Sequence, residues 1–248
     1  MKIIKIIILG LLIPFSVYPQ SRFSISLSAS PVLSNSALQT DKESDAIGGV
    51  TYKDMINDIN DRDKYSPGFK IHLGINYYLN EKLSFNSGLN YLKQDLSQSN
   101  LDPPFSFNYE TNTINHSYGT SKISLNYISL PLGLCWDFVS KNKFLMGFNF
   151  GISEDYLMNK KTLNESSLTY TQNEVSAEGI IIDSYMRYAS EVNLGLTMKF
   201  KVNQNTIFFT QPNFNYFFTP NLTRYIYINQ NNYYFGIEFG FQYTMNGH

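Results

Sequence analysis

Apolar and polar residues alternate with a period of two along much of the chain, as in a β-strand whose two faces lie in different environments. Eight segments carry this pattern, at residues 22–30, 68–78, 83–93, 122–138, 143–153, 190–202, 206–218 and 233–245. In the second segment the apolar positions are Phe69, Ile71, Leu73, Ile75 and Tyr77. The pattern therefore predicts an all-β fold of about eight strands.

The predicted strands are long for a soluble sheet. Strands in globular proteins usually have about 5–6 residues, whereas a tilted strand that crosses a bilayer needs about 9–11. The segment at 233–245 alternates over this greater length, with Gly236, Glu238 and Gly240 between large apolar residues. Lipid on one side and a polar interior on the other produce such a pattern. We therefore expect a transmembrane antiparallel up-and-down β-barrel.

Short and long connections alternate between the predicted strands. Short turns fall at 80–82, 140–142 and 203–205, and long polar stretches fall at 33–65, 95–121, 157–184 and 219–231. Outer-membrane barrels have short periplasmic turns and long extracellular loops. Aromatic residues gather near the short turns and again near the long stretches, as expected of the girdles at two membrane interfaces. We expect both ends of the barrel domain on the periplasmic side.

The fourth segment changes phase in its middle. Its apolar residues occupy odd positions at Ile123, Leu125 and Tyr127, and even positions from Ile128 to Phe138. An extra residue in one strand shifts the alternation in this way and also tolerates a proline within a strand. The sequence therefore predicts a β-bulge in this strand, which would accommodate Pro131.

The N-terminus predicts export. Lys2 and Lys5 precede an apolar run at 6–15 that is too short for the roughly 20 residues of a spanning helix. We interpret 1–20 as a cleaved signal peptide and 21–248 as the outer-membrane β-barrel domain. Cys135 is the single cysteine, so an intramolecular disulfide is excluded.

Composition agrees with a membrane barrel and argues against nucleic-acid binding. Charged residues make up 16% of the chain, below the usual level of about 25%, and aromatic residues also make up 16%. Mean hydropathy is nevertheless −0.23, because Asn, Ser and Thr are abundant. The net charge of −1 provides no broad basic field. We expect the outer membrane of a Gram-negative bacterium as the location.

Three stretches resemble the PorT-like outer-membrane β-barrel family, which comprises small eight-stranded barrels of the OmpA/OmpX type. They are the hairpin GFKIHLGINYYLNEKLSFNSGLNY, the strand YISLPLGL with its internal proline, and the final NYYFGIEFGFQY. The resemblance covers most of residues 21–248. It implies the barrel fold and, because the named member assists a protein secretion system, contacts with envelope or secretion-system proteins.

Charged residues on the inward phase are candidates for a site in the lumen. An eight-stranded barrel is just wide enough for side chains to fill its interior, and a charge left unpartnered there costs several kcal/mol. We predict structural ion pairs among Lys70, Asp137, Glu191, Lys199 and Glu238. Asp137 and Lys199 are expected near the periplasmic end, and the other three in the middle or outer part.

The sequence predicts no catalytic residues, no metal ligands and no cofactor. The motifs GxSxG, GxGxxG and HExxH do not occur. The leading hypothesis is a non-enzymatic barrel whose partners are outer-membrane lipid and possibly other envelope proteins, with no role for nucleic acid. The alternatives are an enzyme that modifies the acyl chains of lipid A, and a small-solute pore. A lipid-directed base should reach the lipid face, whereas His72 is predicted to point into the lumen.

Overall fold

The computed structural model describes residues 23–40, 53, 57, 60–61, 63–108, 113–165, 184–219, 222–225 and 228–245. The predicted signal peptide lies outside the described residues. No helix in the described part of the chain is long and apolar enough to cross a membrane.

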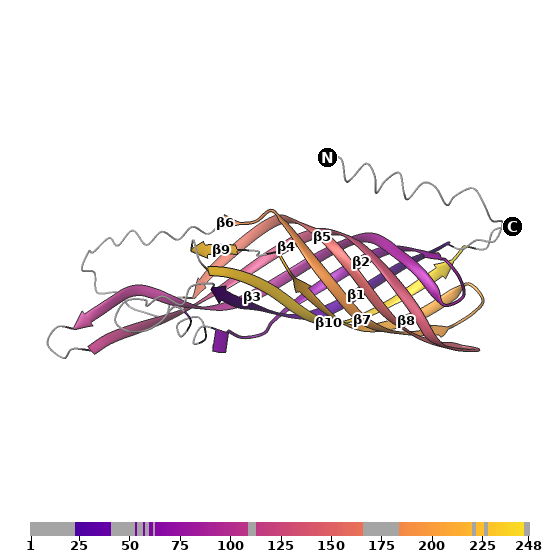
Figure 1. The fold of residues 1–248 in the computed structure, drawn as a ribbon, viewed down its shortest axis with the longest axis horizontal. Coiled ribbons are helices and arrows are strands. Elements are labelled where there is room, and N and C mark those ends of the chain that lie inside the picture. Colours follow the sequence, from indigo (N-terminus) through magenta and orange to yellow (C-terminus); the bar gives the residue numbers. More distant parts are fainter. Residues whose placement is uncertain are drawn as a thin grey trace.

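Eight long strands form the wall of the molecule (Figure 1). They are β1 (Phe23–Thr40), β2 (Ser66–Tyr78), β3 (Leu83–Asn108), β4 (Thr113–Lys141), β5 (Phe144–Glu165), β7 (Tyr188–Lys201), β8 (Thr206–Phe217) and β10 (Ile228–Thr244). Two short strands, β6 (Ser184–Tyr185) and β9 (Leu222–Tyr225), pair with each other, and β9 also pairs with β10.

The sheet closes on itself. Each long strand pairs antiparallel with its neighbours along the chain, and β1 pairs with β10 from Ser24↔Thr244 to Thr40↔Ile228. The start of β1 and the end of β10 therefore meet at one end of the barrel, together with the short turns after β2, β4 and β7. The predicted antiparallel barrel and its three short turns are confirmed.

Side chains alternate between the lumen and the outer surface as the sequence predicts. On the outer face Leu27, Phe148 and Ile237 expose 59%, 54% and 48% of their surface. This exposed surface would contact lipid. Ser26 and Glu238, one residue away from two of them, expose 4% and 6% because they point into the lumen. Apolar side chains are thus exposed and polar side chains buried, the reverse of a soluble protein, because the barrel is surrounded by lipid.

The bulge predicted at the phase change of the fourth segment is wrong. The extra residue on β4 is Phe138, close to the end of the strand. Strand β4 keeps its alternation, and Ile123, Leu125 and Tyr127 point inward and are buried. The phase of the sequence changes because the lumen itself becomes apolar there. The nearby irregularity in pairing lies on β5, where Met158 is the extra residue between the partners of Asn126 and Tyr127.

Several segments expected to be loops continue as strand. The structure extends β1 to Thr40, β3 to Asn108 and β5 to Glu165. The hairpin of β3 and β4 projects far beyond the rest of the barrel, in magenta at the left of Figure 1, and stays paired as far as Asn108↔Thr113. Polar sequence does not end these strands, because strand pairing uses backbone groups and not side chains.

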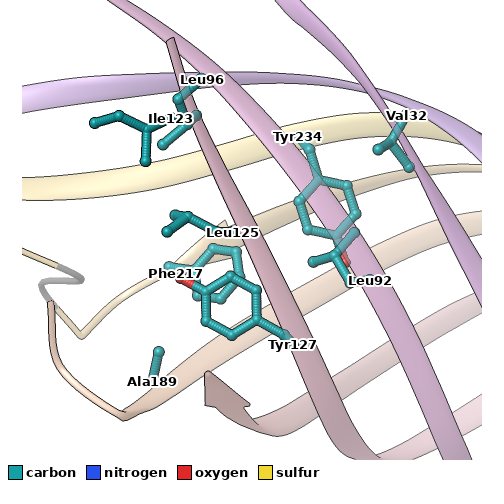
Figure 2. Close-up of a cluster of buried hydrophobic side chains, with 9 residues drawn as sticks. All are labelled: Val32, Leu92, Leu96, Ile123, Leu125, Tyr127, Ala189, Phe217 and Tyr234. Atoms are coloured by element: carbon teal, nitrogen blue, oxygen red, sulfur yellow. The ribbon is translucent and has the colours of Figure 1, made fainter. Parts of the chain in front are cut away.

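A cluster of apolar side chains fills the lumen toward the end opposite the short turns (Figure 2). The cluster residues and Leu157, which packs against them, come from seven of the eight long strands, and thus from almost the whole circumference of the barrel. We refer to this group as the apolar plug: Val32, Leu92, Leu96, Ile123, Leu125, Tyr127, Ala189, Phe217 and Tyr234, with Leu157 packed against it. The prediction of a polar interior is therefore wrong for this part of the barrel.

The alternation assigns Phe148 to the lipid face, and an arginine there would have to be placed in hydrocarbon. We expect Phe148→Arg to lower the free energy of unfolding by up to about 2–4 kcal/mol, the cost at the bilayer midplane, which falls toward the interfaces. Denaturant titration of the barrel folded in lipid vesicles measures this. Phe148→Leu is the matched control and should change stability by less than about 1.5 kcal/mol. Similar stabilities for the two variants would contradict the assignment.

Candidate functional site in the barrel lumen

Below the apolar plug the lumen contains a polar chamber. Its cavity of about 90 Å³ is lined by polar side chains from most strands, among them Lys70, His72, Asn90, Glu191, Lys199 and Glu238. The buried side chains of Leu145, Ile207 and Phe209 lie toward the short-turn end. The chamber can accommodate water, because it is polar and larger than a single water molecule requires.

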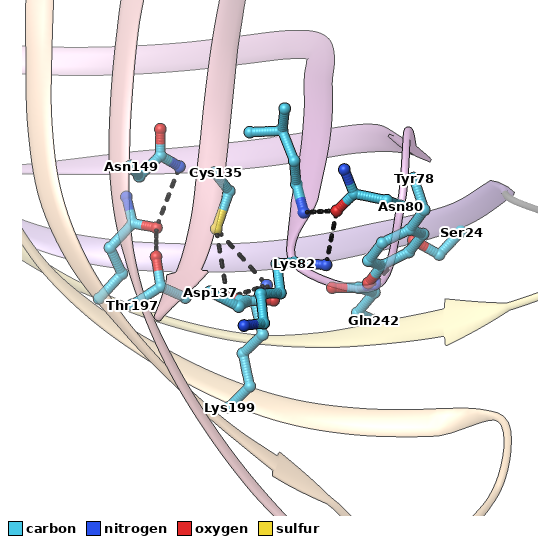
Figure 3. Close-up of polar contacts among 12 residues, drawn as sticks. Ser24, Tyr78, Asn80, Lys82, Cys135, Asp137, Asn149, Thr197, Lys199 and Gln242 are labelled. Carbon is cyan, nitrogen blue, oxygen red and sulfur yellow. Dashed lines mark hydrogen bonds and ion pairs between the residues drawn. The ribbon is translucent and has the colours of Figure 1, made fainter. Parts of the chain in front are cut away.

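Lys199 and Asp137 form a tight ion pair near the short-turn end (Figure 3). The Lys199 ammonium lies 2.9 Å from both carboxylate oxygens of Asp137 and donates a 3.5 Å hydrogen bond to the Cys135 sulfur. The two charges come from β7 and β4, on either side of β5. Gly147 of β5 leaves room between them, because a Cβ atom there would lie 2.5 Å from an Asp137 oxygen.

Lys70 and Glu238 meet across the seam that closes the barrel. Their charged atoms are 3.8 Å apart, and both side chains are buried. Ser28 of β1, which lies between β2 and β10, donates a hydrogen bond to Glu238. The Lys70 ammonium also lies 5.9 Å from the ring centroid of Tyr234, at the base of the apolar plug. Lys70 therefore links the closing seam to the plug.

Glu191 differs from the expected pairing. One of its carboxylate oxygens accepts a 3.2 Å hydrogen bond from the Tyr234 hydroxyl. The other has no hydrogen-bond partner among the described residues, and Glu191 forms no ion pair among them. Lys70, which lines the same chamber, is already engaged by Glu238. Glu191 lines the polar chamber, where water can solvate its free oxygen.

Asp155 is a buried lumen carboxylate that the sequence analysis missed. It accepts hydrogen bonds from Ser129 and from Ser153, the latter at 3.2 Å, and is 1% exposed. Its position continues the inward phase of Gly151 and Ser153 on β5, so extending the alternation by two residues would have found it.

Uncharged polar side chains form a further network on β5, β7 and β8. Gln211 accepts hydrogen bonds from Thr197 at 2.7 Å and from Asn149 at 3.3 Å. Farther along, Asn215 accepts a 2.6 Å bond from Asn193 and donates a 2.9 Å bond to Asn213. These bonds satisfy polar groups that would otherwise be costly in a closed lumen.

His72 points into the lumen, as the sequence predicts. Its Nδ1 atom lies 2.6 Å from the Asn90 side-chain oxygen, and Gly74 makes room for the ring, because a Cβ atom there would lie 2.4 Å from Nε2. Within the described ranges, no group of three or more His, Cys, Asp and Glu side chains is arranged to hold a metal ion. The geometry supports mutual satisfaction of polar groups inside a closed barrel.

The comparison with protein families decides what kind of barrel this is. Residues 20–209 match the family model for the outer membrane protein beta-barrel domain. The chain belongs to the outer membrane protein β-barrel domain family. The barrel is therefore an integral protein of the Gram-negative outer membrane, with lipid against its apolar outer face.

Solved structures with a similar chain path include other outer-membrane barrels. Neisserial surface protein A is 12% identical, with a TM-score of 0.47, covering 92% of this chain and 100% of that one. The outer membrane protease OmpT of Escherichia coli is 9% identical, with a TM-score of 0.48, covering 93% and 99%. The outer membrane protein OprG of Pseudomonas aeruginosa is 9% identical, with a TM-score of 0.39, covering 91% and 98%. No curated protein sequence matches the chain.

The ion pair between Lys199 and Asp137 gives a direct test of lumen electrostatics in this family member. Lys199→Met leaves Asp137 buried without its partner, and we expect a loss of about 3–5 kcal/mol in the free energy of unfolding. Adding Asp137→Asn to the same chain removes the stranded charge and should recover a large share of the loss. Denaturant titrations of the single and double variants measure this coupling.

Lys201→Met is the control for the ion-pair test. Lys201 lies two residues farther along β7 and is exposed. Its replacement should change stability by no more than about 0.5 kcal/mol. Additive losses in the double variant would show that the two lumen charges do not depend on each other.

Proposed function

We propose that this protein is a non-enzymatic outer-membrane barrel that contacts other envelope proteins on the side opposite the short turns. The projecting hairpin of β3 and β4 carries this proposal (Figure 1). Among the described residues, β3 pairs only with β4 beyond Ser97, and β4 pairs only with β3 before Thr120. Such backbone edges can add a strand from a partner protein.

The lumen supports a structural role over that of a solute pore. The apolar plug brings side chains from opposite walls into one cluster, with Tyr127 and Phe217 ring centroids 5.7 Å apart and Phe217 and Tyr234 6.2 Å apart. An eight-stranded barrel has no spare width around such a cluster. The ion pairs and the hydrogen bonds between amide side chains in the chamber connect the strands of the wall further.

The position of His72 favours the non-enzymatic proposal over lipid modification. Its ring is hydrogen-bonded within the lumen, whereas lipid acyl chains lie against the opposite face of β2. The resemblance of the hairpin of β2 and β3, the YISLPLGL segment of β4 and the final strand β10 to the PorT-like family supports assistance to protein secretion as the specific role. In that case the partners are components of an envelope secretion machinery.

Site-specific photo-crosslinking tests the hairpin as a protein contact. Ser106 and Asn115 lie opposite each other on β3 and β4, and a photo-reactive amino acid at either position should yield protein adducts in living cells. The same amino acid at Ile237, on the lipid face, is the control and should yield no protein adduct. Deletion of residues 98–120 should abolish secretion if the PorT-like role holds. Hairpin positions that yield no protein adducts would contradict the proposal.

Topology gives a second test, because the proposed contact requires the hairpin to be outside the cell. An epitope inserted near Asn112 should be detected on intact cells, and one inserted at Asn142 only after lysis. Asn142 lies in the short turn between β4 and β5. The reverse pattern would place the hairpin in the periplasm.

The apolar plug also predicts that the barrel does not conduct ions. Wild-type barrel in planar bilayers should show no sustained single-channel conductance, because the apolar cluster leaves no continuous water-filled path along the axis. Steady conductance steps in the wild type would favour the pore function instead. A change in the acyl pattern of lipid A on deletion of the gene, restored by the intact gene, would favour the enzyme.

A further inference from the structure

The short-turn end of the barrel is positively charged. The turn residues at 79–82, 140–143 and 201–205 include four exposed lysines, Lys82, Lys141, Lys143 and Lys201, and one acidic residue, Glu81. Their net charge is +3, in a chain whose overall net charge is −1. Every one of the three turns contributes at least one lysine. We refer to these four lysines as the periplasmic rim.

The backbone around the rim is fixed by hydrogen bonds. The Asn80 side-chain oxygen accepts bonds from the amides of Lys82 and Leu83, each at 2.9 Å. The Asn203 side chain holds the turn after Lys201 in the same way, through the amides of residues 205 and 206 at 2.9 and 2.8 Å. The Lys201 amide donates a 2.8 Å bond to the Lys143 carbonyl, which places two of the lysines on adjacent strands.

The rim lies next to the aromatic girdle that marks the membrane interface. The rings of Phe144 and Phe200 are 5.0 Å apart, and Lys143 and Lys201 are their immediate neighbours in the chain. Trp136, 53% exposed, pairs with Leu83, the residue after Lys82. Aromatic girdles sit at the level of lipid headgroups, and a lysine stem can lie along apolar surface while its ammonium reaches the phosphates.

We propose that the periplasmic rim binds the headgroups of anionic phospholipids in the periplasmic leaflet. The four ammonium groups are point charges that would pair with phosphodiesters. A headgroup with net negative charge would keep this attraction, whereas the choline of a zwitterionic lipid opposes it. The barrel would therefore collect anionic lipid around one of its two ends. This role is independent of the protein contacts proposed for the hairpin.

The chain contains its own reporter for this site, because Trp136 is the single tryptophan and faces lipid beside the rim. The barrel is folded into vesicles of equal parts phosphatidylglycerol and phosphatidylcholine. In one preparation the phosphatidylglycerol is brominated in the upper acyl chain, and in the other the phosphatidylcholine is. Bromine quenches Trp fluorescence on contact, so the ratio of the two quenching efficiencies reports which lipid lies next to Trp136.

We expect brominated phosphatidylglycerol to quench more strongly, with a local preference of about fivefold at low salt. The preference should fall at 1 M salt, where the screening length is about 3 Å. In the variant K82Q/K141Q/K143Q/K201Q the preference for phosphatidylglycerol should be lost, so that the ratio of the two quenching efficiencies is about one. The control K93Q/K122Q/K161Q, which removes three lysine charges toward the opposite end of the barrel, should leave the preference unchanged.

Folding is checked by the heat-dependent mobility shift of the barrel on a gel. If the fourfold variant does not fold, K82Q/K201Q and K141Q/K143Q are used, and each should lower the preference. Arginine at the four positions should retain it. Equal quenching by the two lipids in the wild type, or an unchanged preference in the glutamine variants, would overturn the proposal.

Discussion

The absence of water in the hydrocarbon core governs this structure. A backbone amide or carbonyl left unpaired in lipid costs several kcal/mol, so a sheet that crosses the membrane must have no open edge there. The pairing of β1 with β10 meets this requirement, and it joins residues that are 188 (Thr40 and Ile228) to 220 (Ser24 and Thr244) positions apart in the chain. The outward position of Phe148 and the inward position of Glu238 both follow from the closed, alternating wall that results.

Closure creates a second problem inside the barrel, because half of the side chains are directed into a narrow lumen. The molecule solves it differently at different depths. Near the short turns, buried charges pair directly, as Lys199 does with Asp137. In the middle, three carboxylates, Asp155, Glu191 and Glu238, depend on one lysine, hydroxyl groups and solvated space. Beyond them apolar side chains pack together across the lumen.

The two ends of the barrel are built for different surroundings. At one end the turns are tight, fixed by asparagine side chains, and carry the lysines of the periplasmic rim. At the other end β3 and β4 leave the barrel as a paired hairpin. Each strand of the hairpin satisfies the backbone groups that face its partner, and the opposite edges stay available to water or to another strand. The proposed lipid contacts and protein contacts thus belong to opposite ends.

The sequence by itself determined the all-β class, the approximate number of strands, the three short turns and the inward or outward direction of most side chains. These properties depend on a period of two and on turn residues, which are local. It also identified Lys70, Asp137, Lys199 and Glu238 as inward charges, because each lies on a clear polar phase.

Only the tertiary structure decided which inward residues meet. The partner of Lys199 lies two strands away around the wall, and no local pattern encodes that distance. Periodicity also failed at Ile123, Leu125 and Tyr127, because an apolar residue looks the same in sequence whether it faces lipid or a dry lumen. The length of the hairpin was hidden for a related reason: outside the bilayer a strand needs no apolar side toward lipid, so the sequence loses its alternation while the backbone pairing continues.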